Sequence, residues 1–249
     1  MNRRQRRQRT QDALLSTATR AAAWSACLSC LGLAACHGPA TFNRAPSSAT
    51  SAPTVALEAH YRIDPERSQV LIRVYRDGPL AALGHNHVLS VRDLSGELTL
   101  PSGADLTQTS FTLDFPVGAI AIDDSGLREQ QGAEFAGTID AASIEGTRAH
   151  MLGESLLDAA HYARIELRSG PVRAEGDHWL VQVRIRVRDQ EALAEVPVSL
   201  QVAGASLICS GAFELTHAQL GLKPYSVALG ALRVAESMHV SYRLIAERS

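Results

Sequence analysis

Hydrophobic and polar residues alternate with a period of two along most of the chain after residue 57. The clearest run is DHWLVQVRIRVRD, in which Trp179, Val181, Val183, Ile185 and Val187 share one parity and glutamine and arginine take the other. Successive side chains of a strand point to opposite faces, so this run predicts a half-buried antiparallel strand with a polar outer face.

The same alternation returns in several other segments that are separated by turn residues such as SG and EGD. These segments begin near Val70, Phe111, Ala163, Val196, Leu207 and Met238. About eight such strands predict an all-β domain, either a closed antiparallel barrel or a sandwich. One segment, 142–162, breaks the pattern and predicts a short helix over about 143–152. That helix would join two strands and could cap a barrel mouth.

The N-terminus has the pattern of an export signal rather than of a folded element. Five arginines and no acid occupy the first nine residues, and an apolar stretch of small residues runs from Ala21 to Cys36. The stretch is short for a membrane span and ends in LAAC, which resembles a bacterial lipobox. We therefore expect a lipoprotein signal peptide over 1–35 and lipidation of Cys36. An ordinary signal peptide and an uncleaved anchor are the alternatives.

Residues 36–56 are rich in Pro, Ser, Ala and Thr and predict a flexible tether, followed by one domain over 57–249. By analogy with lipoprotein sorting, His37 in place of an aspartate favours the outer membrane, on its periplasmic side. Cys209 is the sole cysteine of the expected domain, so no disulfide can form within it. It lies on an apolar strand face, which is typical of a buried, inert thiol.

Composition and motifs narrow the function classes. The 249 residues carry a formal net charge of −2, so no basic face for nucleic acid is expected. Neither a G-x-S-x-G elbow nor an H-E-x-x-H motif occurs, and we do not expect an enzyme. The acidic pair Asp123 and Asp124 is interpreted as a solvated turn.

The segment AALGHNHVLSV carries the most chemistry. If its strand begins as early as Gly84, His85 and His87 share the apolar face with Leu89. Two imidazoles at this spacing can bind one metal ion when further ligands join them. Strand parity offers His161 or His217 as the third ligand. The alternative is that the histidines bond to backbone at a barrel rim, or to the polar head of a ligand.

Four segments, in this order and spacing, resemble the YceI-like family. They are HYRIDPERSQVLIRVYRDG (60–78), DLSGELTL (93–100), MLGESLLDAAHYARIELRSG (151–170) and GLKPYSVALGALRVAESMHVSYRLIA (221–246). The turn DQEALAEV departs from the family pattern because it lacks a histidine, and GHNH suggests a subgroup. The resemblance implies an exported protein with a lipocalin-like barrel whose apolar tunnel holds a polyisoprenoid lipid.

We therefore expect an envelope carrier for an amphiphilic isoprenoid-type lipid, such as a quinone or polyprenyl chain. Residues expected to bind the ligand are Val74, His85, His87, Leu89, Phe111, Leu113, His161, Phe213, His217 and Tyr225. The main alternative is a metal-binding or redox-accessory periplasmic protein that uses His85 and His87 with His161 or His217. A barrel filled by its own side chains is a third reading. An envelope redox protein and a homodimer are further partner hypotheses.

Overall fold

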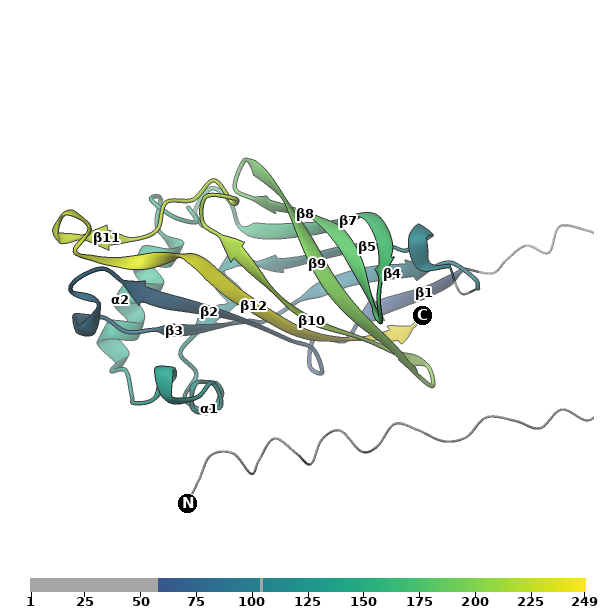
Figure 1. Cartoon of the computed structure of the whole chain (residues 1–249), viewed down its shortest axis with the longest axis horizontal. Helices are drawn as coiled ribbons and strands as arrows, with labels where there is room; N and C mark the ends of the chain where they lie inside the picture. The colour runs from purple at the N-terminus through teal and green to yellow at the C-terminus, as the bar shows by residue number, and fades with distance from the viewer. Residues whose placement is uncertain (1–57, 104) are drawn as a thin grey trace, which may run out of the picture. The chain divides into compact units, whose positions relative to one another are not determined.

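A computed structural model describes residues 58–103 and 105–249, in which eight antiparallel strands close into a barrel (Figure 1). In their order around the ring, the strands are β1 (Ala59–Ile63), β4 (Ser95–Leu100), β5 (Ser110–Pro116), β7 (Arg164–Glu175), β8 (His178–Val187), β9 (Gln190–Ala203), β10 (Ser206–Thr216) and β12 (Leu232–Arg248). Pairing of β1 with the end of β12 closes the ring, as Tyr61 lies opposite Arg248. The predicted all-β, antiparallel lipocalin-like barrel is confirmed.

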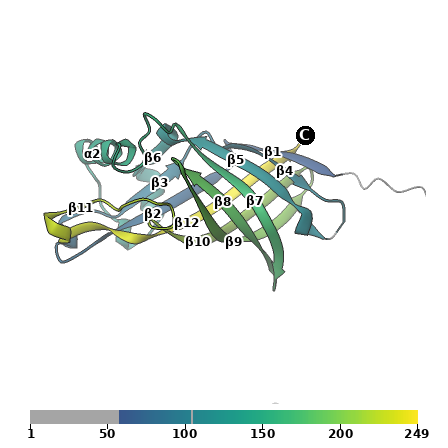
Figure 2. The ribbon, with the colours of Figure 1, turned by 90° about the horizontal axis from the view of Figure 1, so that it is seen from above.

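Four more strands extend the sheet at one end of the barrel. β12 is 17 residues long. One of its edges pairs with β10, and the other pairs with β2 (Gln69–Asp77) along most of its length and with β1 at its C-terminal end. β3 (His87–Val91) pairs with β2, and β6 (Ile120–Ile122) pairs with β3. The two-residue β11 (Ser226–Val227) pairs with the start of β12. Figure 2 shows β2, β3, β6 and β11 gathered at the end of the barrel where α2 lies.

The helices are short and lie in the connections. They are α1 (Ser125–Glu129), α2 (Ala141–Leu152) and the 3₁₀ turns η1 (Ala81–Leu83), η2 (Leu106–Gln108), η3 (Val117–Ala119), η4 (Ala133–Phe135) and η5 (Ala228–Gly230). The predicted helix corresponds to α2, which begins two residues earlier. Asp140 caps it by accepting hydrogen bonds from the backbone N–H and the hydroxyl of Ser143, at 2.9 and 2.7 Å. Among the described residues, no helix has the length and apolarity needed to cross a bilayer.

The inner face of the barrel follows the predicted alternation. Val181, Val183, Ile185 and Val187 of β8 are buried, whereas Arg184 and Arg186 between them are exposed. Cys209 is buried, as expected, and is the only cysteine in the part of the chain that the structure describes. Burial raises the pKa of its thiol to about 12.

The strands β9 and β10 separate over part of their length. These strands pair only between Ser199–Ala203 and Ser206–Ser210. Just past this point the Tyr242 hydroxyl of β12 donates a hydrogen bond to the Pro197 carbonyl of β9, at 2.7 Å. It passes over Gly211, where an added Cβ would lie 2.1 Å from that carbonyl oxygen. Glycine therefore permits the close contact that joins the diverging strands.

The expected signal peptide over 1–35 lies outside the described residues, and so does residue 57, the first residue of the expected domain. The same holds for the tether over 36–56 and for Cys36. These remain predictions.

Candidate functional site

Two cavities occupy the interior. The first, which we call the ring cavity, has a volume of about 150 Å³ and lies inside the eight-stranded ring. Its lining is almost entirely apolar and includes Val70, Leu98, Phe111, Leu113, Trp179, Val181, Val183, Cys209, Phe213, Val240 and Tyr242. A dry space with such a lining accommodates hydrocarbon rather than water. Phe111, Leu113 and Phe213 thus lie on a cavity, where the sequence placed them.

The second, which we call the histidine cavity, is larger, at about 310 Å³, and mixes apolar with polar side chains. Its polar lining residues are Tyr75, Arg76, His85, His87, Ser143, Thr147, His150, His217, Tyr225 and Arg233. Val74 and Leu89 also line it, as predicted. α2 forms one wall through Ser143, Thr147, His150 and Met151, so the helix covers one end of the barrel as the sequence suggested.

The two cavities meet end to end on the same inner face. On β2, Val70 lines the ring cavity and Ile72 the histidine cavity. On β8, Ile185 lines the ring cavity and Val187 the histidine cavity. On β12, Val240 lines the ring cavity and Met238 the histidine cavity. Residues two apart on a strand share a face and lie about 7 Å apart. The two cavities therefore adjoin along one inner face, and together they outline an apolar path from the histidines into the ring.

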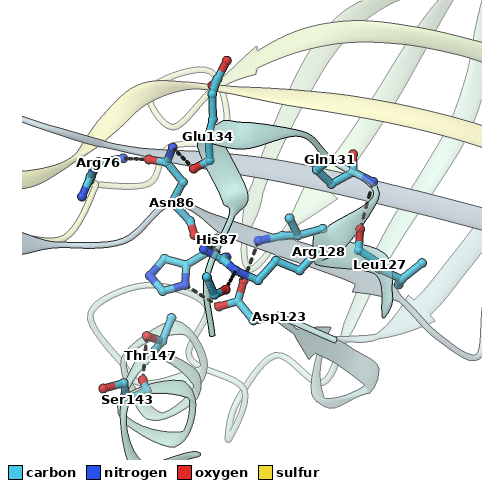
Figure 3. A network of polar contacts seen from close by, with 12 residues as sticks. Arg76, Asn86, His87, Asp123, Leu127, Arg128, Gln131, Glu134, Ser143 and Thr147 are labelled. Carbon is cyan, nitrogen blue, oxygen red and sulfur yellow. Dashed lines mark hydrogen bonds and ion pairs between the residues drawn. The ribbon is translucent and has the colours of Figure 1, made fainter. Parts of the chain in front are cut away.

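His87 is held by a buried carboxylate at the edge of the histidine cavity (Figure 3). Its Nδ1 lies 2.6 Å from Oδ2 of Asp123. The other oxygen, Oδ1, accepts hydrogen bonds from the Val88 backbone N–H at 2.9 Å and from Nη1 of Arg128 at 2.7 Å. Burial of the carboxyl raises its pKa, but the hydrogen bonds from His87 and Val88 and the charges of His87 and Arg128 together lower it below the usual value.

An ionised Asp123 can only accept hydrogen bonds, so Nδ1 of His87 carries a proton and donates it. Nε2 then lies on the far side of the ring from Asp123, as Figure 3 shows. No hydrogen-bond partner for Nε2 is present among the residues that the structure describes. In the neutral imidazole, Nε2 is an acceptor that is available to a molecule in the cavity.

Asp123 and Arg128 correct the sequence interpretation of this loop. Asp123 is buried and not a solvated turn, whereas Asp124 is exposed and caps α1. Arg128 is also buried; it donates to the Asn86 carbonyl at 2.6 Å and lies over the Phe135 ring. Asn86 itself accepts from the Arg76 backbone N–H and donates to the Glu134 carbonyl, at 3.0 Å each, so it fastens this loop to β2.

The other predicted histidines divide into two groups. His217 is buried, lines the histidine cavity and bonds through Nδ1 to the Glu236 carbonyl at 3.0 Å. His161 was predicted on the inward parity, but β7 begins only at Arg164. Its side chain is 74% exposed and pairs with Asp158 in a turn, away from both cavities. The structure therefore gives no support to the expectation that His161 binds a ligand or metal.

The strand also begins later than expected at GHNH. β3 starts at His87, so His85 precedes it and lies exposed at the cavity mouth. The two rings are 6.4 Å apart, and Nδ1 of His87 is occupied by Asp123. No group of three or more His, Cys, Asp or Glu side chains within 58–103 and 105–249 has a geometry that could hold a metal ion. The metal set of His85, His87 and His161 or His217 does not come together.

One cavity residue, His150, and the buried Asp123 behind His87 were missed at the level of the sequence. His150 is in the last turn of α2, and its ring lies 4.6 Å from that of Tyr225, the predicted loop residue, which also lines the histidine cavity. Asp123 was interpreted as part of a solvated turn, but an Asp that follows the apolar residues of β6 can point inward as well as outward. No Asp or Glu side chain of the described residues lines either cavity, whereas Arg76 and Arg233 line the histidine cavity.

The YceI-like domain model matches residues 61–246, which is most of the chain and all but the ends of the barrel. The chain belongs to the YceI-like family. No curated protein matches this YceI-like chain by sequence. BcnA of Burkholderia cenocepacia is 14% identical, with a TM-score of 0.55, over 74% of this chain and 98% of BcnA. This likeness supports the same fold.

Two other solved structures are similar at lower TM-scores. A polyisoprenoid binding domain from Saccharophagus degradans, implicated in plant cell wall breakdown, is 14% identical with a TM-score of 0.49. The likeness covers 78% of this YceI-like chain and 100% of that one. The YceI protein of Campylobacter jejuni is 5% identical with a TM-score of 0.44, over 65% of this chain and 84% of that one.

Proposed function

We propose that this YceI-like protein binds an amphiphilic isoprenoid-type lipid, with the tail in the ring cavity and the head group at the histidines. The observation that carries the proposal is the end-to-end arrangement of the two cavities along β2, β8 and β12. An apolar path with a polar end matches a molecule with one long hydrocarbon chain and one polar head. A barrel filled by its own side chains would lack such a path.

The polar end supports a head group with a hydroxyl or an anionic oxygen. His87 offers Nε2, and its ring orientation is fixed by Asp123, which removes rotational freedom before any ligand arrives. Arg76 adds positive charge, and Arg233 also lines the cavity, although its guanidinium pairs with Asp77 at 2.6 Å. A phenol, a quinol or a phosphate head would find partners here, and a polyprenyl or quinone-type chain would extend into the ring cavity.

We infer a carrier rather than an enzyme. Two hydroxyl residues of the histidine cavity, Ser143 and Thr147, are engaged within α2: the Ser143 hydroxyl bonds to Asp140, and the Thr147 hydroxyl donates to the Ser143 carbonyl. Neither is hydrogen-bonded to a histidine, so the geometry of an activated nucleophile is not formed by these residues. The redox-accessory alternative depended on the metal set that does not come together.

Export and membrane anchoring complete the proposal, and they rest on sequence. The basic start, the apolar stretch and the LAAC of residues 33–36 support a lipoprotein held to the outer membrane on its periplasmic side. A Cys36→Ser variant that leaves the membrane fraction would support lipidation at that residue. Unchanged fractionation would argue against it.

Native mass spectrometry of protein purified from a bacterial host tests the binding proposal. We expect a retained lipid of several hundred daltons, released on unfolding. A Val183→Phe variant adds a ring inside the ring cavity and should lose the lipid. Arg184→Phe, the neighbour on the outer face of β8, is the matched control and should retain it. If the unaltered protein retains no lipid and takes none up when an isoprenoid lipid is supplied, the proposal fails.

A further inference from the structure

Exposed apolar side chains gather at one end of the barrel. Of the seven large hydrophobic residues exposed in the described part of the chain, five lie in two connections, 80–83 and 225–229. They are Leu80, Leu83, Tyr225, Val227 and Leu229. Leu83 is 73% exposed and Leu229 is fully exposed. We call these two connections the tip. Such gathering on a water-soluble surface marks a site of interaction.

The two connections of the tip are joined to each other. The Leu80 N–H donates to the Ala231 carbonyl at 2.8 Å, and Gly78 packs so closely on Ala231 that a Cβ there would lie 2.5 Å from its carbonyl oxygen. Figures 1 and 2 both show η1 and β11 at the same end of the domain, where the start of β12 pairs with β11 and with the end of β2. The five side chains therefore belong to one surface and not to two unrelated loops.

The tip adjoins the lining of the histidine cavity. Gly84 and His85, which follow Leu83, line that cavity, and Tyr225, Leu232 and Arg233 line it from the other connection. Ala228 and Leu229 have φ values of 50° and 55°, in the left-handed region that non-glycine residues avoid. The turn that they form directs Leu229 into solvent, where it contacts no other part of the domain.

The charge of the tip decides what it contacts. Within 76–86 and 223–233 there are three cationic side chains, Arg76, Lys223 and Arg233, and one carboxylate, Asp77, which pairs with Arg233 at 2.6 Å. The chain as a whole carries −2. Two copies of the tip would bring like charges together. An anionic lipid surface attracts cations and takes up leucine and tyrosine side chains at the interface.

We propose that the tip docks on an anionic lipid bilayer, with Leu83 and Leu229 inserted among the lipids and Arg76 and Lys223 at the headgroups. Docking places the mouth of the histidine cavity against the bilayer, so an amphiphile enters without crossing water. The docking itself stands whether or not the cavity holds an isoprenoid lipid.

Site-specific insertion tests the proposal in the full chain. Leu229→Trp places an indole at the tip, and Val202→Trp places one at an equally apolar, 63% exposed site in β9, outside the tip. With phosphatidylglycerol vesicles that carry brominated acyl chains, we expect quenching of the Leu229→Trp emission beyond that of the unaltered chain, and none beyond it for Val202→Trp. Because the readout is local, an N-terminal anchor does not imitate it.

Binding strength gives a second readout. Leu83→Glu with Leu229→Glu should weaken partitioning into phosphatidylglycerol vesicles about tenfold relative to Leu193→Glu with Val202→Glu, which adds the same charge at exposed sites of β9. Phosphatidylcholine vesicles should bind more weakly. Equal quenching at positions 229 and 202 would overturn the proposal. So would a shielded Leu229→Trp indole without vesicles, since protein would then cover the tip.

Discussion

Nδ1 of His87 and Oδ2 of Asp123 lie 2.6 Å apart, and this contact orients one of the polar groups of the histidine cavity. The two residues are on β3 and directly after β6, which pair through Leu89 and Ile122. Arg128 supplies the opposite charge to Asp123, so the carboxylate remains ionised in a buried place. The ring of His87 is thereby fixed with Nδ1 as donor and Nε2 towards the cavity.

Removal of the Asp123 carboxylate should destabilise the protein strongly. Asp123→Ala leaves the guanidinium of Arg128 buried without its partner, and loss of one member of a buried ion pair costs about 3–5 kcal/mol. The neighbouring Asp124→Ala removes a helix cap and an exposed ion pair with Arg92, for about 1 kcal/mol. Urea unfolding at pH 7 compares the two. Equal costs would contradict the role of Asp123 in the buried network.

The same carboxylate should make stability depend on pH. The pKa of Asp123 is lowered in the folded state, so its contribution is present above its unfolded pKa of about 3.9 and is lost as the pH falls through the folded pKa. Unfolding free energies measured from pH 6 down to pH 3 should decline less steeply in Asp123→Asn than in the unaltered chain. Parallel curves would assign the acid sensitivity to other carboxylates.

The head group should be recognised by its hydroxyl. A farnesyl-substituted phenol can donate to Nε2 of His87, whereas its methyl ether cannot and leaves the nitrogen unpaired. We expect the phenol to bind on the order of tenfold more tightly, which is the effect of one hydrogen bond of about 1.4 kcal/mol. Calorimetric titration of both compounds measures the preference.

Variants of the two histidines locate that preference. His87→Ala should bind phenol and ether equally, because the acceptor is gone. His85→Ala should keep the preference, because His85 lies exposed at the mouth with no carboxylate to orient it. A preference that survives in His87→Ala would place the recognition elsewhere, with His217 as the next polar group on the cavity wall.

Most of the barrel could be predicted from the sequence because the alternation of β8 and its neighbours has a single physical cause. Each strand has one face on the cavities and one on solvent, so inward residues such as Val183 and Val240 are aliphatic and their neighbours are polar. Most of the lining of the ring cavity follows from strand parity, whereas Leu94, Leu106 and Thr109 come from connections. The extension of the ring by β2, β3 and β6 cannot be predicted from parity, because the pairing of β2 with β12 depends on the length of β12 and on its bulge.

The histidine cavity was predicted less well because it is built from strand ends and connections. Parity applies to His87 and Leu89 but fails for His85 and His161, each of which precedes the strand that it was assigned to. Asp123 and Arg128 come from a loop whose burial depends on the packing of Phe135 against Tyr75. No local sequence pattern predicts that contact. His150 meets Tyr225 from 75 residues away, for the same reason.

Cys209 should resist thiol reagents in the folded protein. Its side chain lines the apolar ring cavity, and burial raises its pKa to about 12, so the reactive thiolate is scarce at pH 8. Iodoacetamide at pH 8, followed by peptide mass spectrometry, should find Cys209 unmodified in native protein and modified after unfolding. Ready modification in the native state would mean that the ring cavity opens to water.

Gly211 in β10 should tolerate substitution poorly, because Pro197 and Tyr242 make their contact directly over it. In Gly211→Ala the new Cβ would lie 2.1 Å from the Pro197 carbonyl oxygen and 2.8 Å from the Tyr242 hydroxyl, so the backbone of β9 must move and the hydrogen bond between them must lengthen. Forced overpacking of this kind costs about 1–3 kcal/mol or more.

Gly118→Ala is the matched control, because a Cβ there meets no atom within 4 Å. Thermal unfolding should separate the two variants by several degrees, since 1 kcal/mol shifts the Tm by about 2–4 °C in a domain of this size. A Tm for Gly211→Ala equal to that of Gly118→Ala would show that β9 and β10 can separate without loss, and that the Tyr242 hydrogen bond does not hold the ring together.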